Sequence, residues 1–239
     1  MALLHLTFAP CPLDRLEKPD AEEAHVWLVD LETPCDNWLS PAEQERANAM
    51  RHAEKQRHFI AARSALRLIL SKYVGGAPDK LALAAAAQGK PFLDMPDALQ
   101  FNVTHARGKA LIAIAPVSVG IDLEFARSVR NLDRLVEDYF APEEEKSLTS
   151  LPNDQRAQAF LAAWTRKEAC LKATGEGIAG GLHRYRVTLR ADEEAQLVSI
   201  DGNESAARDW SLHAFTAFGD GQAAICAESP SLSVQGFVL

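Results

Sequence analysis

The segment Val119-Gly120-Ile121-Asp122-Leu123-Glu124 carries the residues on which the fold and the chemistry of this chain depend. Its apolar and polar residues alternate, which is typical of a half-buried strand, so Gly120, Asp122 and Glu124 leave one face together. The two carboxylates lie about 6.5 Å apart along such a strand, at about 3.3 Å per residue. Gly120 contributes no side chain on that face, and we expect it to leave room for something to lie against the backbone beside the negative charges.

A second motif, Trp164-Thr165-Arg166-Lys167-Glu168-Ala169-Cys170-Leu171-Lys172, follows about forty residues later. On a helix Trp164, Glu168 and Lys172 form one stripe, with Lys167 beside it. The candidate metal ligands are Asp122, Glu124 and Glu168. With Lys172 they suit Mg²⁺ carrying a phosphate ester, because magnesium completes its octahedral shell with water and phosphate oxygens. Taken separately, each part is more commonly a solvated strand face or a helix-surface ion pair.

The composition limits the class of protein. The chain has 239 residues, of which 47% are hydrophobic, enough for one large domain or two small ones. The net charge of −8 argues against nucleic acid as the main partner, because a phosphate backbone attracts a basic surface. The four cysteines lack metal-ligand spacing and indicate reduced, cytosolic residues. No signal peptide is recognised and no apolar run approaches the about 20 residues of a membrane span, so we expect a cytoplasmic protein.

Two sequence echoes point to an internal duplication. Val29-Asp30-Leu31-Glu32 resembles Ile121-Asp122-Leu123-Glu124, and Phe59-Ile60-Ala61-Ala62 resembles Phe160-Leu161-Ala162-Ala163. The two offsets are close but unequal, as expected from a duplication with one altered loop, although short apolar words also match by chance. We predict an α+β fold of two similar α/β halves related by a pseudo-twofold axis, with the active site in the cleft between them. The halves are residues 1–116 and 117–239.

Hydrophobic periodicity places the expected elements. Strands are predicted at residues 25–31, 81–85, 99–104, 110–115, 118–124, 184–190, 196–200, 209–216, 222–227 and 232–238. Helices are predicted at residues 41–53, 55–73, 129–139, 142–150 and 154–174. Arg107-Gly108 supplies a turn between two strands, which predicts an antiparallel hairpin.

These motifs resemble the 4′-phosphopantetheinyl transferase superfamily, in its larger, two-half, surfactin-synthetase-activating type. The family signature is a Val-Gly-Ile-Asp strand, then about forty residues, then Trp-x-x-Lys-Glu-Ala-x-x-Lys. The resemblance runs from Ser40 to Gly177. It implies Mg²⁺-dependent transfer of 4′-phosphopantetheine from coenzyme A to a serine of an acyl or peptidyl carrier protein, releasing adenosine 3′,5′-bisphosphate. We expect a monomer that binds neither nucleic acid nor membrane.

The resemblance also implies coenzyme A contacts in the first half. Gly89-Lys90-Pro91 is expected to let a flat ring approach the backbone and to direct the Lys90 ammonium at a phosphate, although Gly-Lys-Pro alone is an ordinary turn. Phe101-Asn102-Val103-Thr104-His105 matches a Phe-Asn-Ile-Ser-His segment of the family. That match assigns phosphate contacts to Thr104 and His105. Asp122 and Lys172 complete the expected coenzyme A site.

A further basic residue of the family holds the 3′-phosphate of coenzyme A from a helix that starts with Ser-Pro. In Ser40-Pro41-Ala42-Glu43-Gln44-Glu45-Arg46 the matching residue is Arg46, whose planar guanidinium suits a phosphate. Glu43 stands where some members have a second lysine. Arg57 and Arg63 are candidates to replace it, although amphipathic-helix surface is their commoner role.

The catalytic roles follow from the resemblance and from acid–base chemistry. Glu168 is the expected general base for the serine hydroxyl, with a water held by the metal as the alternative. Lys172 and the metal are expected to offset charge on the leaving oxygen. A non-catalytic coenzyme A or carrier-protein binding module and an unrelated Mg²⁺ phosphohydrolase are the alternative functions. The intact acidic set argues against the first, and the phosphate contacts argue against the second.

Carrier docking needs a local basic patch, because the carriers of this family are acidic and this chain has a net charge of −8. Arg127, Arg130 and Arg134 are spaced three and four residues apart, which predicts one helix face near the metal. A solvated face paired with neighbours such as Glu137 is the alternative.

Overall fold

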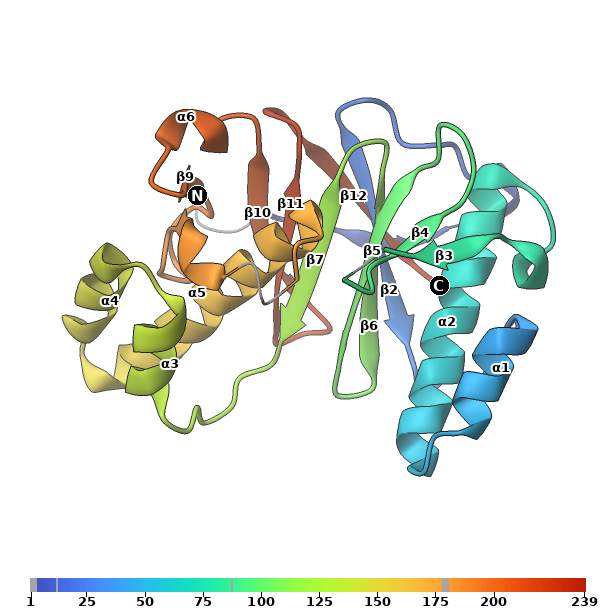
Figure 1. The fold of residues 1–239 in the computed structure, drawn as a ribbon, viewed down its shortest axis with the longest axis horizontal. Helices are drawn as coiled ribbons and strands as arrows, with labels where there is room; N and C mark the ends of the chain where they lie inside the picture. The colour runs from blue at the N-terminus through green and yellow to red at the C-terminus, as the bar shows by residue number, and fades with distance from the viewer. Residues whose placement is uncertain (1–3, 12, 87, 178–180) are drawn as a thin grey trace.

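The computed structural model describes residues 4–11, 13–86, 88–177 and 181–239. Two main β-sheets pack against each other, and one long helix covers the outer face of each (Figure 1). The mixed helix and sheet content agrees with the predicted class. Among the residues described here, no helix is both long and apolar enough to cross a lipid bilayer.

The first sheet has five strands in the order β1-β12-β2-β6-β5. The strands are β1 (Phe8–Pro10), β2 (Glu23–Asp30), β5 (Gln100–Ala106), β6 (Lys109–Ala115) and β12 (Ser233–Val238). Strands β1, β12 and β2 run parallel, and β6 pairs antiparallel with β2 and β5. The predicted hairpin at Arg107-Gly108 is confirmed, with φ of 49° and 70° at the two turn residues. Helix α2 (Ala53–Val74), preceded by α1 (Pro41–Asn48), covers the outer face.

The second sheet has three antiparallel strands in the order β10-β11-β7. These are β7 (Val119–Glu124), β10 (Ser211–Ala217) and β11 (Gly221–Ala227), and helix α5 (Asn153–Thr174) covers their outer face. Smaller elements surround the sheets. They are η1 (Leu13–Arg15), η2 (Pro78–Lys80), the pair β3 (Leu83–Ala85) and β4 (Pro91–Leu93), α3 (Leu132–Tyr139), α4 (Pro142–Thr149), η4 (Leu182–Arg184), the pair β8 (Tyr185–Val187) and β9 (Leu197–Ile200), and α6 (Glu204–Ala207).

The inner faces of the two sheets pack against each other. Val26 and Leu111 of the first sheet share a buried cluster with Ile121, Leu123 and Ile225 of the second. The layers therefore run α2, first sheet, second sheet, α5 (Figure 1). Because the side chains of a strand alternate between its faces, the apolar residues of β7 face the other sheet and its polar residues face α5.

The last strand returns to the first sheet. Strand β12 lies between β1 and β2, although its residues belong to the predicted second half. A boundary near Pro116 therefore does not separate the two sheets completely. Several short elements were not predicted, because three or four residues are too few to show a hydrophobic period. They are β1, β4, α6, η1, η2 and η4.

Candidate active site

The two sheets meet at the edge strands β5 and β7, and side chains join them there. The Oδ1 atom of Asn102 accepts a hydrogen bond of 2.9 Å from the Ile121 amide, and the Thr104 hydroxyl donates one of 3.2 Å to Oδ1 of Asp122. Asn102 and Thr104 are both buried. Asn102 was not predicted as a site residue. The sequence does contain a sign of it, because Asn102 is a polar residue two positions before Thr104 and therefore on the same face of an otherwise apolar strand.

Asp122 is the centre of this junction. The ammonium of Lys172 lies 2.6 Å from its Oδ1 atom and 3.4 Å from the Thr104 hydroxyl oxygen. The other carboxylate oxygen, Oδ2, is buried and has no hydrogen-bond partner among the described residues. One oxygen of Asp122 is thus engaged by a lysine, while the other is a buried acceptor without a donor.

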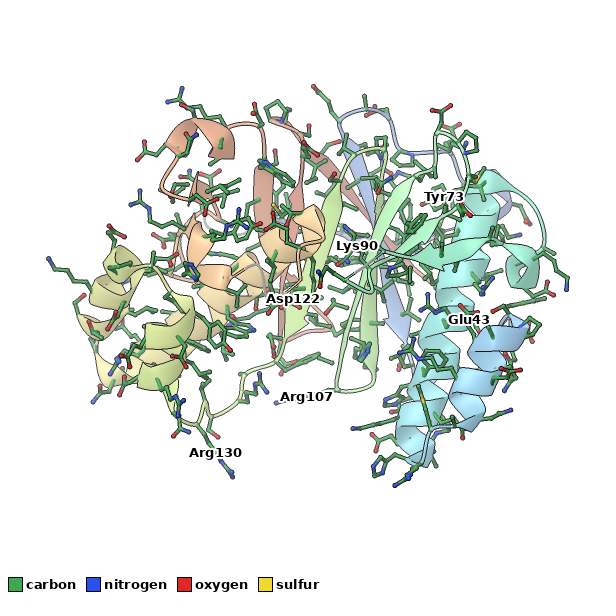
Figure 2. All side chains as sticks on the ribbon, in the orientation of Figure 1. Glu43, Tyr73, Lys90, Arg107, Asp122 and Arg130 are labelled. Atoms are coloured by element: carbon green, nitrogen blue, oxygen red, sulfur yellow. The ribbon has the colours of Figure 1, made fainter. Side chains whose placement is uncertain are left out.

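A cavity of about 550 Å³ opens beside Asp122. It is lined from β5, from β7 and the loop after it, and from α5, by Val103, Thr104, His105, Ala106, Asp122, Leu123, Glu124, Arg127, Trp164, Glu168 and Lys172. The structure therefore brings the predicted acidic set and Lys172 to one cavity; Figure 2 labels Asp122 near the middle of the molecule.

The three carboxylates line this cavity without forming a tight cluster. Among the described residues, the trio of metal-ligand side chains whose donor atoms all lie within 4.8 Å is Glu32, Glu54 and His58, near the start of α2. Like charges repel, which keeps the oxygens of the acidic set farther apart than those of a closed metal site.

Burial and mutual repulsion shift the titration of two of these carboxyls. Burial raises the pKa of Glu168, and the nearby Asp122 and Glu124 raise it further, while Lys172 opposes the shift. Burial also raises the pKa of Glu124, and Asp122 adds to this, whereas Arg127 and Lys172 lower it. Both side chains therefore hold a proton more tightly than an exposed glutamate does.

Gly120 leaves the room predicted beside the carboxylates, and a helix occupies it. A Cβ atom at this position would lie 2.1 Å from the Ala169 carbonyl oxygen and 2.3 Å from the Ala173 amide nitrogen. The backbone of α5 therefore lies directly against the strand at Gly120. The absent side chain lets α5 cross β7 closely enough for Lys172 to reach Asp122.

The other residues of the helical motif divide between structure and cavity. Lys167 is fully buried and pairs at 2.6 Å with Glu144 of α4, while donating to the carbonyls of Leu182 and Tyr185. Trp164 lines the cavity and stacks on Phe160 with ring centroids 5.6 Å apart. Lys167 thus anchors the helix, and the stripe of Trp164, Glu168 and Lys172 faces the site.

Thr104 and His105 both line the cavity, from opposite faces of β5. Thr104 points toward β7, as its hydrogen bond to Asp122 shows. His105 follows it in the strand and is exposed. The ring is nevertheless partly enclosed; this partial burial lowers the pKa of His105, and the positive charges of Lys172 and His58 lower it further. The edge position of β5 lets both residues reach one space.

Lys90 and Gly89 are not among the residues that line this cavity. The Lys90 ammonium lies 2.7 Å from the Lys172 carbonyl oxygen and 3.1 Å from those of Val119 and Ala173. Burial lowers the pKa of Lys90 to about 8, so its amine is charged at neutral pH. Gly89 has φ of 83° in the turn before β4, a conformation that favours glycine.

Glu43, the departure from the family pattern, belongs to an ionic network inside the first half. Its carboxylate lies 2.6 Å from Nε of Arg67 and 3.3 Å from Nε of Arg63, and it caps α1 together with Ser40. Arg63 is thereby committed to Glu43. Arg46, on the same helix, is exposed, and its guanidinium lies 5.2 Å from the centroid of the Phe59 ring.

The three arginines proposed for docking do not share one helix. Helix α3 starts at Leu132, so Arg127 and Arg130 precede it and only Arg134 lies within it. Arg127 is 3.4 Å from Glu124, and Arg134 pairs with Asp138 rather than Glu137. Arg130 is exposed, at the lower edge of the view in Figure 2. The prediction of one helix face is wrong, because the helix starts three residues later than expected.

Comparison with known proteins identifies the family. The sequence model of the 4′-phosphopantetheinyl transferase superfamily matches residues 118–227. A 4′-phosphopantetheinyl transferase, HetI, from Nostoc sp. is 37% identical over 187 residues, covering 74% of this chain and 78% of its own length. A putative 4′-phosphopantetheinyl transferase from Synechocystis sp. is 32% identical, covering 68% of this chain and 69% of its own.

A more distant relative agrees. A 4′-phosphopantetheinyl transferase from Bacillus subtilis is 23% identical, covering 80% of this chain and 83% of its own. Among solved structures, the holo-[acyl-carrier-protein] synthase of Thermotoga maritima aligns with 47% of this chain and 64% of its own at 20% identity, with a TM-score of 0.34.

The chain belongs to the 4′-phosphopantetheinyl transferase superfamily. It is therefore an enzyme, a transferase of the 4′-phosphopantetheinyl group.

Proposed function

We propose that this enzyme transfers 4′-phosphopantetheine from coenzyme A to a serine of an acyl or peptidyl carrier protein in the cavity between β5, β7 and α5. The observation that carries the proposal is the buried Oδ2 atom of Asp122, which has no donor among the described residues while Lys172 neutralises Oδ1. Family membership supplies the reaction, and this cavity collects the acidic and basic groups that it needs.

The residues of the cavity fit Mg²⁺. Asp122, Glu124 and Glu168 offer the hard oxygen ligands that magnesium prefers. The buried Oδ2 atom of Asp122 is an acceptor that a cation could satisfy, and the negative charges of Asp122 and Glu124 add to the effect of burial on the pKa of Glu168. A bound divalent cation would neutralise this charge and the pyrophosphate of coenzyme A together.

In the transfer, the serine oxygen bonds to the phosphorus nearest the pantetheine, and the bond from that phosphorus to the bridging oxygen breaks. Adenosine 3′,5′-bisphosphate leaves. We assign the serine proton to Glu168, because it is a carboxylate of this cavity on the same helical stripe as Lys172. Lys172 faces the leaving oxygen, while Thr104 and His105 position the phosphates from β5.

The finer architecture is part of the proposal. Two halves, residues 1–116 and 117–239, related by a pseudo-twofold axis, would place this cavity in the cleft between them. Helices α2 and α5 support it, because each has 22 residues and each covers the outer face of one sheet. Arg46 is proposed to hold the 3′-phosphate, and Gly89 to let the adenine approach.

The test is a mass measurement on carrier proteins. The enzyme is incubated with coenzyme A, Mg²⁺ and a panel of apo carrier proteins, each paired with a variant whose acceptor serine is alanine. We expect one carrier at least to gain one phosphopantetheinyl group, its alanine variant to gain none, and EDTA to stop the reaction. Binding of coenzyme A without mass gain on any carrier would favour a non-catalytic module, and hydrolysis of coenzyme A would favour a phosphohydrolase.

A further inference from the structure

Lys90 lies between two parts of the molecule that are far apart in sequence. It directly precedes β4, and its ammonium donates to carbonyls at the start of β7 and at the end of α5. An ammonium has three N–H donors, and three carbonyl oxygens surround this one at 2.7 to 3.1 Å. In this arrangement no donor is left for a phosphate.

Two of the three carbonyls need such a partner. Helix α5 ends at Thr174, so the carbonyls of Lys172 and Ala173 belong to its last turn and have no partner within the helix. The carbonyl end of a helix also carries partial negative charge, which favours a cation there. The Lys90 ammonium supplies both the donors and the charge.

The same place is where α5 crosses β7. Gly120 follows Val119, whose carbonyl Lys90 binds, and the α5 backbone from Ala169 to Ala173 lies directly against Gly120. The loop around Lys90 also lies over the end of the helix, since a Cβ on Gly175 would be 3.5 Å from Cδ of Lys90. Lys90 therefore holds α5 and β7 together where they cross, and these two elements carry the acidic set.

Lys172 links the Lys90 contacts to the proposed active site. Its carbonyl oxygen accepts the shortest of the three Lys90 bonds, at 2.7 Å, and its own ammonium lies 2.6 Å from Asp122. Glu168 lies one helical turn earlier on the same stripe. A shift of α5 along or across β7 would move Lys172 and Glu168 together relative to Asp122.

We propose that Lys90 is a positioning residue, which holds α5 against β7 so that Glu168 and Lys172 face Asp122, and that its ammonium does not bind coenzyme A. This inference rests on the proposed function of the cavity. It replaces the phosphate contact expected for Lys90 from the family resemblance.

Two substitutions separate positioning from phosphate binding. Lys90→Met removes the charge and keeps most of the length. Lys90→Arg keeps a charge that suits a phosphate, but its planar fork cannot direct three donors at three converging carbonyls. Lys80→Met is the matched control, because Lys80 is exposed and pairs with its neighbour Asp79.

The measurements are kcat and KM for coenzyme A, and the calorimetric Kd for coenzyme A without Mg²⁺. If Lys90 is a positioning residue, both Lys90 variants lose kcat by about tenfold to a hundredfold, as misplaced catalytic groups do, while KM and Kd change less than about threefold. Lys80→Met behaves like the wild type.

Other outcomes overturn the proposal. A raised Kd for Lys90→Met with a near-normal Lys90→Arg would make Lys90 a phosphate ligand. Unchanged kcat in both variants would remove any role in positioning, and unfolding of both would make Lys90 a residue of general stability. Absence of transfer in the wild type and in Lys80→Met would refute the proposed function, and this inference with it.

Discussion

The Lys172 ammonium and the Asp122 carboxylate lie 2.6 Å apart, so the last turns of α5 are tied by charge to the middle of β7. Asp122 is nearly completely buried, whereas Lys172 is partly exposed. Breaking such a pair leaves a charge without its partner, and the cost is largest when the remaining charge is the buried one.

Replacing Asp122 by Asn should abolish transfer while preserving the fold. The amide keeps the shape of the carboxylate and removes a metal ligand, and Lys172 can turn to solvent or to the other carboxylates of the cavity. We expect kcat to fall by about a hundredfold or more at limiting Mg²⁺, with Tm changed by only a few degrees. Turnover at the wild-type rate under those conditions would contradict the metal assignment.

Replacing Glu168 by Gln should raise stability at neutral pH. The folded state raises the pKa of Glu168, so folding favours its protonated form. Stability from this group is therefore fully present below the ordinary glutamate pKa and is lost as pH rises from there through the raised pKa. In EDTA, the Gln variant should have a higher Tm than the wild type at pH 7, and the difference should shrink toward pH 4.5. Glu143→Gln, on the exposed side of α4, is the control, and an equal or lower Tm for Glu168→Gln at pH 7 would be the contrary result.

Replacing Gly120 by Ala should damage the fold rather than substrate binding. The added methyl group would meet backbone atoms of α5 at 2.1 and 2.3 Å, and backbone cannot turn away as a side chain can. We expect a loss of about 1–3 kcal/mol or more in the free energy of unfolding, measured by urea denaturation. Ser118→Ala, two residues earlier, is the control. Full stability with weakened coenzyme A binding would instead indicate that the ligand, and not α5, lies against Gly120.

Replacing Arg46 by Ala should weaken the use of coenzyme A more than that of dephospho-coenzyme A. The proposed contact is to the 3′-phosphate, which only the first substrate has. A charge-assisted hydrogen bond is worth about 1.5–3 kcal/mol, so kcat/KM for coenzyme A should fall by about tenfold to a hundredfold. The ratio of the two kcat/KM values is the measurement, with Arg51→Ala as control. Equal losses on both substrates would give Arg46 a structural role, for which its contact with Phe59 is the candidate.

Reversing Arg130 and Arg134 to Glu should weaken carrier docking without touching coenzyme A. Both residues are exposed and follow the cavity residue Arg127 in the sequence, Arg130 before α3 and Arg134 within it. We expect a higher KM for the carrier and a flatter dependence of that KM on salt. Arg208→Glu, next to α6, is the control. A carrier KM that stays the same at low salt would move the search to apolar contacts.

Local patterns were sufficient to predict the elements of the site. The strand at β7 and the four-residue stripe of Trp164, Glu168 and Lys172 follow from local sequence, and both are confirmed, although β7 is buried on both faces rather than half-buried. Their meeting at one cavity followed from the family resemblance. Such patterns could not predict which groups a single charged residue contacts in the folded structure.

Gly120, Lys90 and Glu43 show why. A glycine on a strand face signals close approach, but its sequence does not say whether a ligand or a helix approaches. The carbonyls that bind Lys90 are about thirty and eighty residues away, and carbonyls leave no trace in a sequence pattern. From the sequence, Glu43 only marked the absence of a lysine that some family members have, whereas the structure pairs it with Arg63 and Arg67 of the next helix.

The place of β12 bears on how the protein is made. A ribosome releases β1, β2, β5 and β6 first, yet among the strands described here β1 pairs only with β12, and β2 lacks one neighbour until β12 arrives. The three strands of the second sheet must emerge before that strand does. The first half of the nascent chain therefore waits with an open, apolar sheet edge, which is the kind of surface that chaperones bind and that invites aggregation. Removal of residues 233–239, by truncation of the message or by a protease, would leave β1 and β2 without their common neighbour. The removed strand is far from the cavity residues in sequence, but it belongs to the sheet that also contains β5.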